Sequence, residues 1–138
     1  MELNDYNYED IGVGKVFEFK RILTKKNVDE FADLTEDHNP LHTDEEYAKT
    51  TQFKGRIMHG MLAASLFSTL FGMECPGKKN LYLSQSLNFK KPIPPDSELT
   101  VRGTVKQKMD SFKMITIFTE IILNNEVMID GEARVKII

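Results

Sequence analysis

The segment of residues 57–73 limits the fold of this chain more than any other part of the sequence. Its 17 residues include no Asp, Glu, Lys or Arg, and its apolar residues lie on all sides of a helical wheel. A helix without a polar face is one that other structure encloses. A membrane span is disfavoured, because a segment this short that includes His59 and three hydroxyl side chains suits a hydrocarbon layer of ~30 Å poorly. We therefore expect a buried central helix and no membrane association.

Alternation of apolar and polar residues replaces the helical pattern after residue 80. A period of two is typical of strands with one buried face. The aligned sets are Leu81, Leu83, Leu87 and Phe89; Leu99, Val101 and Val105; Ile115, Ile117, Thr119 and Ile121; and Val127, Ile129, Ala133 and Val135. The joints between these four stretches are short, which predicts antiparallel neighbours. The joint at Asn124-Asn125 suits a tight hairpin, because Asn tolerates positive φ.

A fifth alternating stretch, residues 15–23, precedes the helix and predicts a first strand. The apolar face of the resulting sheet is expected to cover the helix. An antiparallel β-sheet wrapped around a long central helix is the hot-dog fold, of the α+β class. We expect one such domain over residues 1–138, with 1–14 as a lead-in segment. The sheet has open edges that one helix does not fill, which favours a homodimer or a higher homo-oligomer.

Charge and cysteine content exclude several classes of function. The chain has 18 basic and 21 acidic residues and a net charge of −3, with no long block of like charge. We therefore expect no general attraction to nucleic acid or to an anionic membrane. Cys75 is the one cysteine, so no intrachain disulfide is expected and a reducing cytoplasm is the expected location. The first residues lack the basic and apolar regions of a signal peptide.

The hexapeptide of residues 37–42, Asp-His-Asn-Pro-Leu-His, is the first candidate for chemistry. A helix predicted upstream should end before Pro40, because the proline ring disfavours a helical Asn39. The hexapeptide is therefore expected to be irregular. His42 is expected just before a further short helix that Thr43 caps.

A turn in this hexapeptide can bring the carboxylate of Asp37 and the imidazole of His42 together around one water. The pKa of a histidine suits taking and returning a proton near neutrality. From these six residues alone, however, a surface loop without chemistry is the favoured interpretation. A metal site is not expected, because Pro40 interrupts the helix that would align His38 with His42.

Gly60 opens the apolar segment directly after His59. Free amides at a helix start attract a carbonyl oxygen that gains negative charge, and a glycine lets a substrate approach the backbone closely. Tight packing at Gly60 explains the residue equally well. Ser68 lies two turns further along a similar face, where it either supports such a site or bonds to a carbonyl of its own helix.

The two motifs, taken in order and at this separation, are far more specific than either alone. The stretches that carry a likeness are residues 31–42 (FADLTEDHNPLH), 50–53, 57–62 (IMHGML), 65–68, 76–77, 82–83 and 85–87, with Phe89 and Pro92. Together they closely resemble the (R)-specific enoyl-CoA hydratases of the MaoC-like dehydratase family. The likeness runs from about Gly14 to the end of the chain.

The resemblance implies a hot-dog domain, a homodimer and a lyase. The implied reaction is the reversible syn addition of water to a trans-2-enoyl-CoA of short to medium chain length, which gives the (R)-3-hydroxyacyl-CoA. Coenzyme A is part of the acyl-CoA substrate, so no separate cofactor is implied. A thioesterase of the same fold stays open, although the central helix offers no extra carboxylate, and so does a non-catalytic acyl-binding subunit. The pathway that uses the product also stays open.

The resemblance also implies roles for single residues. Asp37 and His42 match the catalytic aspartate and histidine, which bind the water, take its proton and return one to the α-carbon. Gly60 matches the residue whose amide meets the thioester oxygen. Asn39 and Ser68 resemble supporting residues that orient the pair.

The phosphates of coenzyme A would need cations near the mouth of the pocket. Lys90, Lys91 and Lys106 are the available candidates. Ordinary solvated surface is the favoured interpretation of all three lysines.

Overall fold

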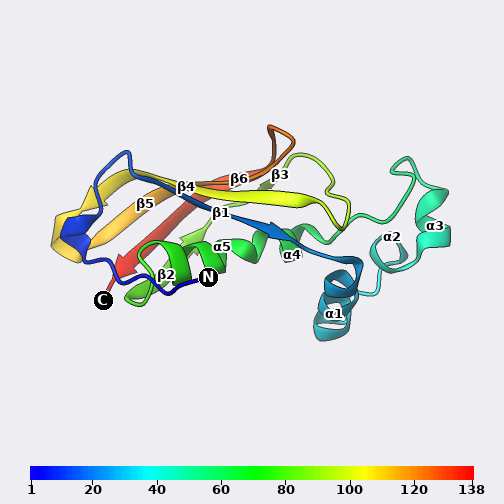
Figure 1. The fold of residues 1–138 in the computed structure, drawn as a ribbon, viewed down its shortest axis with the longest axis horizontal. Helices are drawn as coiled ribbons and strands as arrows, with labels where there is room; N and C mark the ends of the chain where they lie inside the picture. The colour runs from blue at the N-terminus through cyan, green and yellow to red at the C-terminus, as the bar shows by residue number, and fades with distance from the viewer.

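One antiparallel sheet forms the body of the molecule, and helices cover one of its faces and one of its ends (Figure 1). The computed structural model describes residues 1–138. The strands are β1 (Val16–Ile22), β2 (Asn80–Gln85), β3 (Asn88–Phe89), β4 (Glu98–Met109), β5 (Met114–Leu123) and β6 (Glu126–Ile137). Their order across the sheet is β1-β4-β5-β6-β2, and β3 also pairs with β6.

Short helices make up the remaining regular structure. They are η1 (Tyr8–Asp10), α1 (Lys25–Thr35), α2 (Pro40–Thr43), α3 (Glu45–Lys49), α4 (Gly60–Ala64), α5 (Leu66–Thr69), η2 (Leu70–Glu74) and η3 (Asp110–Phe112). In Figure 1, α4 and α5 run along one face of the sheet, whereas α1, α2 and α3 cluster beyond one of its ends. None of these helices combines the length and the apolar character that crossing a membrane requires.

The core lies between the sheet and the segment that contains α4, α5 and η2. Ile115, Ile117 and Ile121 of β5 are fully buried, as the alternation predicted. Phe67 of α5 and Phe71 of η2 are buried in the same cluster. Full burial of each such side chain contributes about 1.5–3 kcal/mol, so the contact between sheet and helices is a main source of stability.

Two local predictions from the sequence are confirmed, namely the hairpin at Asn124-Asn125 and the helix that ends before Pro40. The hairpin between β5 and β6 turns at Asn124 and Asn125, whose φ angles are 49° and 64°. Helix α1 begins after Thr24, whose side chain accepts a hydrogen bond from the amide of Asn27 at 3.1 Å. The helix then ends at Glu36, which has a left-handed φ of 63°.

The central helix consists of three consecutive pieces, whereas the sequence predicted one long helix. Ser65 separates α4 from α5, and its hydroxyl donates to the carbonyl of Leu62 at 2.6 Å. A serine bonded in this way competes with the amides of the helix and bends its axis. The segment then ends in a π-helical turn, η2, in which the amide of Cys75 donates to the carbonyl of Leu70. One side of the segment is open, since Met61 is 58% exposed.

The alternation of β2 has the opposite phase from the one predicted. Leu81 and Leu83, expected to face the core, are 47% and 49% exposed. Tyr82 faces the core instead, where its ring meets the edge of Phe71 at 4.9 Å between centroids. A register shift between Tyr82 and Ser84 interrupts the pairing with β6, and the predicted single strand divides into β2 and β3. This face of β2 therefore leaves apolar side chains in solvent.

The segment that joins β3 to β4 crosses the sheet, although the sequence predicted that these strands are neighbours. β3 pairs with β6, whereas β4 lies between β1 and β5. Residues 92–96 contain three prolines, which keep the segment extended. The segment passes the start of the central helix, where the carbonyl of Ile93 accepts from the amide of Met58 at 2.8 Å. The crossing therefore holds the backbone just before His59.

The lead-in segment packs against the far end of the central helix. The amide of Asn4 donates to the carbonyl of Met73, and the amide of Tyr6 donates to the carbonyl of Pro76, both at 3.0 Å. Ile11 is fully buried in the core cluster. Residues 1–14 are thus part of the packed structure.

Candidate active site

Three side chains that lie far apart in the sequence meet near the start of α4. One donor atom from each of Asp37, His42 and His59 lies within 4.8 Å of the other two. Asp37 follows α1, His42 lies in α2 and His59 precedes α4. The structure therefore brings together the aspartate and the histidine that the sequence suggested would meet, and it adds a second histidine.

Two successive turns fix the chain between Asp37 and His42. The carboxylate of Asp37 accepts a hydrogen bond from the amide of Asn39 at 3.2 Å. The side chain of Asn39 in turn accepts from the amide of Leu41 at 3.0 Å and caps α2. Asp and Asn commonly form such turns with a backbone amide two residues further on. Asp37 and Asn39 thus hold the backbone between Asp37 and His42 in two consecutive turns.

His42 lies inside a short helix, whereas the sequence predicted an irregular segment that ends at His42. Pro40 is the first residue of α2, and the following helix α3 is capped by Asp44 rather than by Thr43. Proline suits the first helical position, because its missing N–H would have no partner there. The restriction that Pro40 places on Asn39 therefore marks the start of a helix.

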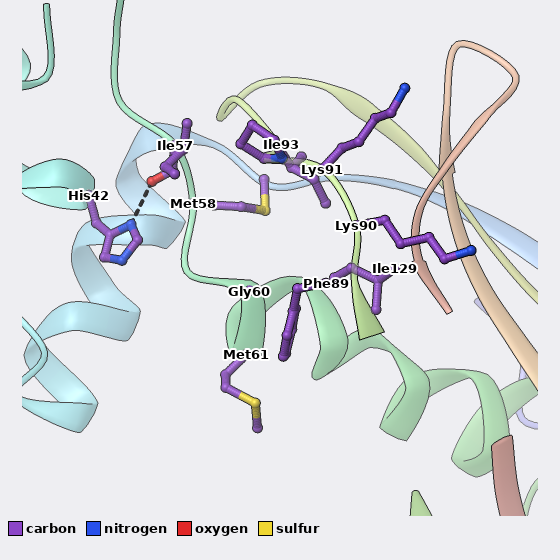
Figure 2. Close-up of a pocket in the computed structure, with 11 residues that line it drawn as sticks. His42, Ile57, Met58, Gly60, Met61, Phe89, Lys90, Lys91, Ile93 and Ile129 are labelled. Carbon is purple, nitrogen blue, oxygen red and sulfur yellow. Dashed lines mark hydrogen bonds between the residues drawn. The ribbon is translucent and has the colours of Figure 1, made fainter. Parts of the chain in front are cut away.

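One hydrogen bond defines which nitrogen of the His42 ring carries a proton. Nδ1 of His42 lies 2.8 Å from the carbonyl oxygen of Ile57 (Figure 2). A carbonyl only accepts, so Nδ1 carries a proton, and in the neutral ring Nε2 keeps its lone pair. His42 can therefore take a proton at Nε2, which is the requirement for a general base.

His59 is the buried member of the cluster, with 3% of its surface exposed. Its Nε2 lies 3.0 Å from the carbonyl oxygen of Asp37 and 3.8 Å from a carboxylate oxygen of the same residue. Its ring lies 4.0 Å from the His42 ring between centroids. Burial lowers the pKa of His59, and the hydrogen bond to Asp37 opposes that shift in part. The sequence assigns no role to His59, and the one signal that could have found it is a histidine in an otherwise apolar segment.

Arg56 is a second residue that the sequence analysis missed. Its Nε donates to the backbone carbonyl of His42, and its guanidinium pairs with the carboxylate of Asp29 in α1 at 2.5 Å. The Arg56 side chain is almost fully buried. It thereby ties α1 to α2 behind the histidine, and nothing in the sequence spacing indicated the contact.

Gly60 is the first residue of α4 and lies beside the cluster. Its amide belongs to the first helical turn, where no preceding carbonyl of the helix is available, and it donates to no other group of the chain. A cavity of about 360 Å³ reaches this backbone and the ring of His42. Figure 2 shows Phe89 standing beside Gly60 in that cavity. The cavity can therefore present a carbonyl oxygen to the Gly60 amide.

Ser68 lies in a second cavity of about 540 Å³, which Tyr82 and Gln85 of β2 also line. Met61 lines both cavities, so the two adjoin at the first turn of α4. Ser68 makes no hydrogen bond with Asp37 or His42 in the structure. Any support that it gives to the pair would act from the side of this second cavity.

The three candidate lysines fall into two groups. Lys90 and Lys91 line the cavity that contains His42 and Gly60, and both ammonium groups point away from His42 (Figure 2). Lys90 pairs with Asp130 at 2.7 Å, and Lys91 pairs with Glu126 at 2.5 Å. Lys106 lines a separate cavity that contains none of the clustered residues.

Two histidines and a carboxylate at these distances are also a donor set that metal ions use. In this cluster, however, Nε2 of His59 donates to the carbonyl of Asp37 and so offers no lone pair. Nδ1 of His59 is buried and has no partner. The Nε2 atom of His59 is therefore already engaged in a hydrogen bond, and the absence of a metal from the reaction stays a prediction.

The fold and the site together define a hot-dog domain with an aspartate and a histidine beside a helix start. Residues 10–127 match the family described as "MaoC like domain". The chain belongs to this MaoC-like family. The match covers both motifs and five of the six strands in full.

Several curated relatives and solved structures are similar over most of their length. The chain is 37% identical to an (R)-specific enoyl-CoA hydratase of Rhodospirillum rubrum over 94% of this chain and 90% of the relative. It is 34% identical to a 3-hydroxybutyryl-CoA dehydratase of Methylorubrum extorquens over 99% of this chain and 87% of the relative. The structure of the (R)-hydratase of Aeromonas caviae involved in PHA biosynthesis superposes with a TM-score of 0.91 at 39% identity, over 94% of this chain and 99% of that one.

Proposed function

We propose that this chain catalyses the reversible (R)-specific hydration of a trans-2-enoyl-CoA to the (R)-3-hydroxyacyl-CoA. It is an enoyl-CoA hydratase, a lyase. The observation that carries the proposal is the meeting of Asp37 and His42 beside the unpaired amide of Gly60. The names of the similar hydratases and of the dehydratase support the same reaction.

The reaction follows from the groups at the site. Nε2 of His42 accepts a proton from water while the water oxygen bonds to the β-carbon. The electron pair of the double bond moves toward the thioester oxygen, where the amide of Gly60 donates to the developing negative charge. An oxyanion donor of this type contributes ~3–4 kcal/mol. The α-carbon then takes a proton from the Asp37 and His42 pair, so one water is added across the double bond.

Coenzyme A is the carrier that suits the cavity. Lys90 and Lys91 line the cavity with their ammonium groups directed away from His42. This direction suits coenzyme A, because its phosphates lie far from the thioester that His42 would act on. Each lysine already faces a carboxylate, so the phosphates would compete with Asp130 and Glu126 for them. Short to medium acyl chains are proposed as substrates, in keeping with the similarity to a 3-hydroxybutyryl-CoA dehydratase.

Two copies of the chain are proposed to pair into a homodimer. Leu81 and Leu83 expose apolar surface along β2. A second copy that covers this surface would remove those side chains from water, which favours association. The cytoplasm is the proposed location, where a lone buried thiol such as Cys75 stays reduced.

The test is an assay of the purified chain with crotonyl-CoA. We expect loss of the absorbance of the enoyl thioester and, on chiral chromatography, the (R)-3-hydroxy product. Release of free thiol from butyryl-CoA without hydration would indicate the thioesterase instead. Binding of crotonyl-CoA without turnover would indicate a non-catalytic acyl-binding subunit.

A further inference from the structure

His59 occupies a helix-capping position but does not cap the helix. It directly precedes α4, and its side chain makes no hydrogen bond to the amides of that helix. Ser, Thr, Asp or Asn at such a position typically stabilises by ~1 kcal/mol relative to a residue that does not cap. The chain forgoes that stabilisation at His59. Departures of this kind from a local rule are expected at functional sites.

The His59 side chain instead contacts both members of the reactive pair. Its Nε2 donates to the backbone carbonyl of Asp37 at 3.0 Å, across 22 residues of sequence. Its ring lies against His42, with centroids 4.0 Å apart and planes 30° apart. The Phe31 ring packs against the His59 ring in an edge-to-face arrangement, with centroids 4.9 Å apart. The ring therefore fixes the backbone of Asp37 and limits the movement of His42 at the same time.

The surroundings favour the neutral form of the His59 ring. Nε2 carries the proton that the Asp37 carbonyl accepts, which leaves Nδ1 as a bare lone pair. Nδ1 is buried without a partner, so protonation would place an unpaired N–H and a positive charge in the interior. The charged or titratable groups that act on His59 are Asp37, His42 and Arg56. A neutral ring beside His42 leaves that residue free to become positive when it takes the water proton.

We propose that His59 is a positioning residue for the Asp37 and His42 pair, acting as a neutral hydrogen-bond donor and as a support for the His42 ring. This proposal rests on the hydratase function proposed above. It assigns to His59 no contact with the substrate. His59 acts through the geometry of the pair, so its loss should lower kcat more than it changes KM.

Two substitutions of His59 separate the hydrogen bond from the packing. His59→Phe keeps a planar ring against His42 and removes the donor. His59→Gln places an amide N–H close to the position of Nε2 and keeps the donor. Because a displacement of about 1 Å costs roughly 100-fold in rate, we expect His59→Phe to lower kcat about 100-fold with KM within about threefold. His59→Gln should recover most of that loss.

A double variant tests whether His59 acts through the pair. Residues that act as one unit show strongly non-additive effects on kcat. In a His42→Ala background, His59→Phe should therefore cause little further loss. Full activity of His59→Phe, or equal losses in the Phe and Gln variants, would overturn the proposal. If His59→Phe does not fold, His59→Asn serves in its place, since its shorter amide does not reach the Asp37 carbonyl.

Failure of the positioning role of His59 can be distinguished from failure of the proposed hydratase function. An inactive wild-type chain that folds would remove the hydratase assignment itself. An active wild-type chain with fully active His59 variants would remove only the positioning role. Thermal unfolding of each variant shows whether a loss of kcat reflects the site or the stability of the fold.

Discussion

The ring of Phe89 lies so close to Gly60 that a side-chain carbon at residue 60 would be 2.6 Å from Cδ1 of the ring. Gly60 opens α4, whereas Phe89 belongs to β3, and both line the cavity that His42 reaches. The missing side chain therefore lets the strand approach the helix while the Gly60 backbone stays open to the cavity.

Gly60→Ala is expected to impair the reaction more than the fold. The added methyl must displace the Phe89 ring, which is half exposed and can turn outward, so the thermal midpoint should change by only a few degrees. Misplacement of substrate at the Gly60 amide should lower kcat/KM at least about 10-fold.

Gly72→Ala is the matched control for Gly60→Ala. Gly72 lies in the same central segment, and a carbon added there meets no atom within 4 Å. The control should keep wild-type kcat/KM. Equal activity in the Gly60 and Gly72 variants would contradict the role of the Gly60 amide.

Asn39→Ala tests how the hexapeptide holds His42 in place. The alanine removes the cap of α2, which should lower the free energy of unfolding by ~1 kcal/mol. Because α2 carries His42, kcat should fall as well. Asn39→Ser supplies another capping oxygen and should retain most of both quantities. The test is to measure the free energy of unfolding in urea and kcat for the two variants. An Asn39→Ala variant with an unchanged free energy of unfolding and an unchanged kcat would refute this role of Asn39.

The sheet was predictable wherever one face of a strand meets the core and the other meets water. β5 satisfies that condition, and the residues that its alternation assigns to the core are buried. β2 does not, because Leu81 and Leu83 are apolar on the face away from the core while Tyr82 packs inward. Alternation alone cannot assign a face when both faces carry apolar residues.

The site was predictable only as far as its local motif. Asp37 and His42 are five residues apart, so a turn was enough to suggest that they meet. His59 and Arg56 reach the pair across 22 and 14 residues. Such contacts depend on the path of the chain through α3 and around the start of α4, which residue spacing does not report.

Lys90 and Lys91 are expected to affect affinity and not chemistry. Removal of both should raise the KM for crotonyl-CoA about 3- to 10-fold at low salt, leave kcat unchanged and have less effect at high salt. Lys106→Ala should have no effect, because Lys106 lines another cavity. A crotonyl-pantetheine thioester, which lacks the coenzyme A nucleotide, should show the same KM with every variant. An equal rise in KM for both thioesters would contradict a role in phosphate binding.

Cys75 is expected to be unreactive in the folded chain. It is fully buried, and burial raises the pKa of its thiol to about 11 from the usual 9.0. A higher pKa means less thiolate at pH 8, by about 100-fold for a shift of this size. Labelling with an aromatic disulfide at pH 8 should therefore be at least about 100-fold slower in buffer than in concentrated urea. Rapid labelling of the native chain would contradict the buried position.

The central claim is that Asp37 and His42 act on one water beside the Gly60 amide. The most direct test compares hydration of crotonyl-CoA by Asp37→Asn, His42→Ala and the control His38→Ala, whose exposed ring pairs only with Asp33. We expect the first two variants to lose at least about 1,000-fold in kcat, with thermal midpoints close to wild type, and the control to stay fully active. Wild-type rates in both the Asp37 and the His42 variants would contradict the account.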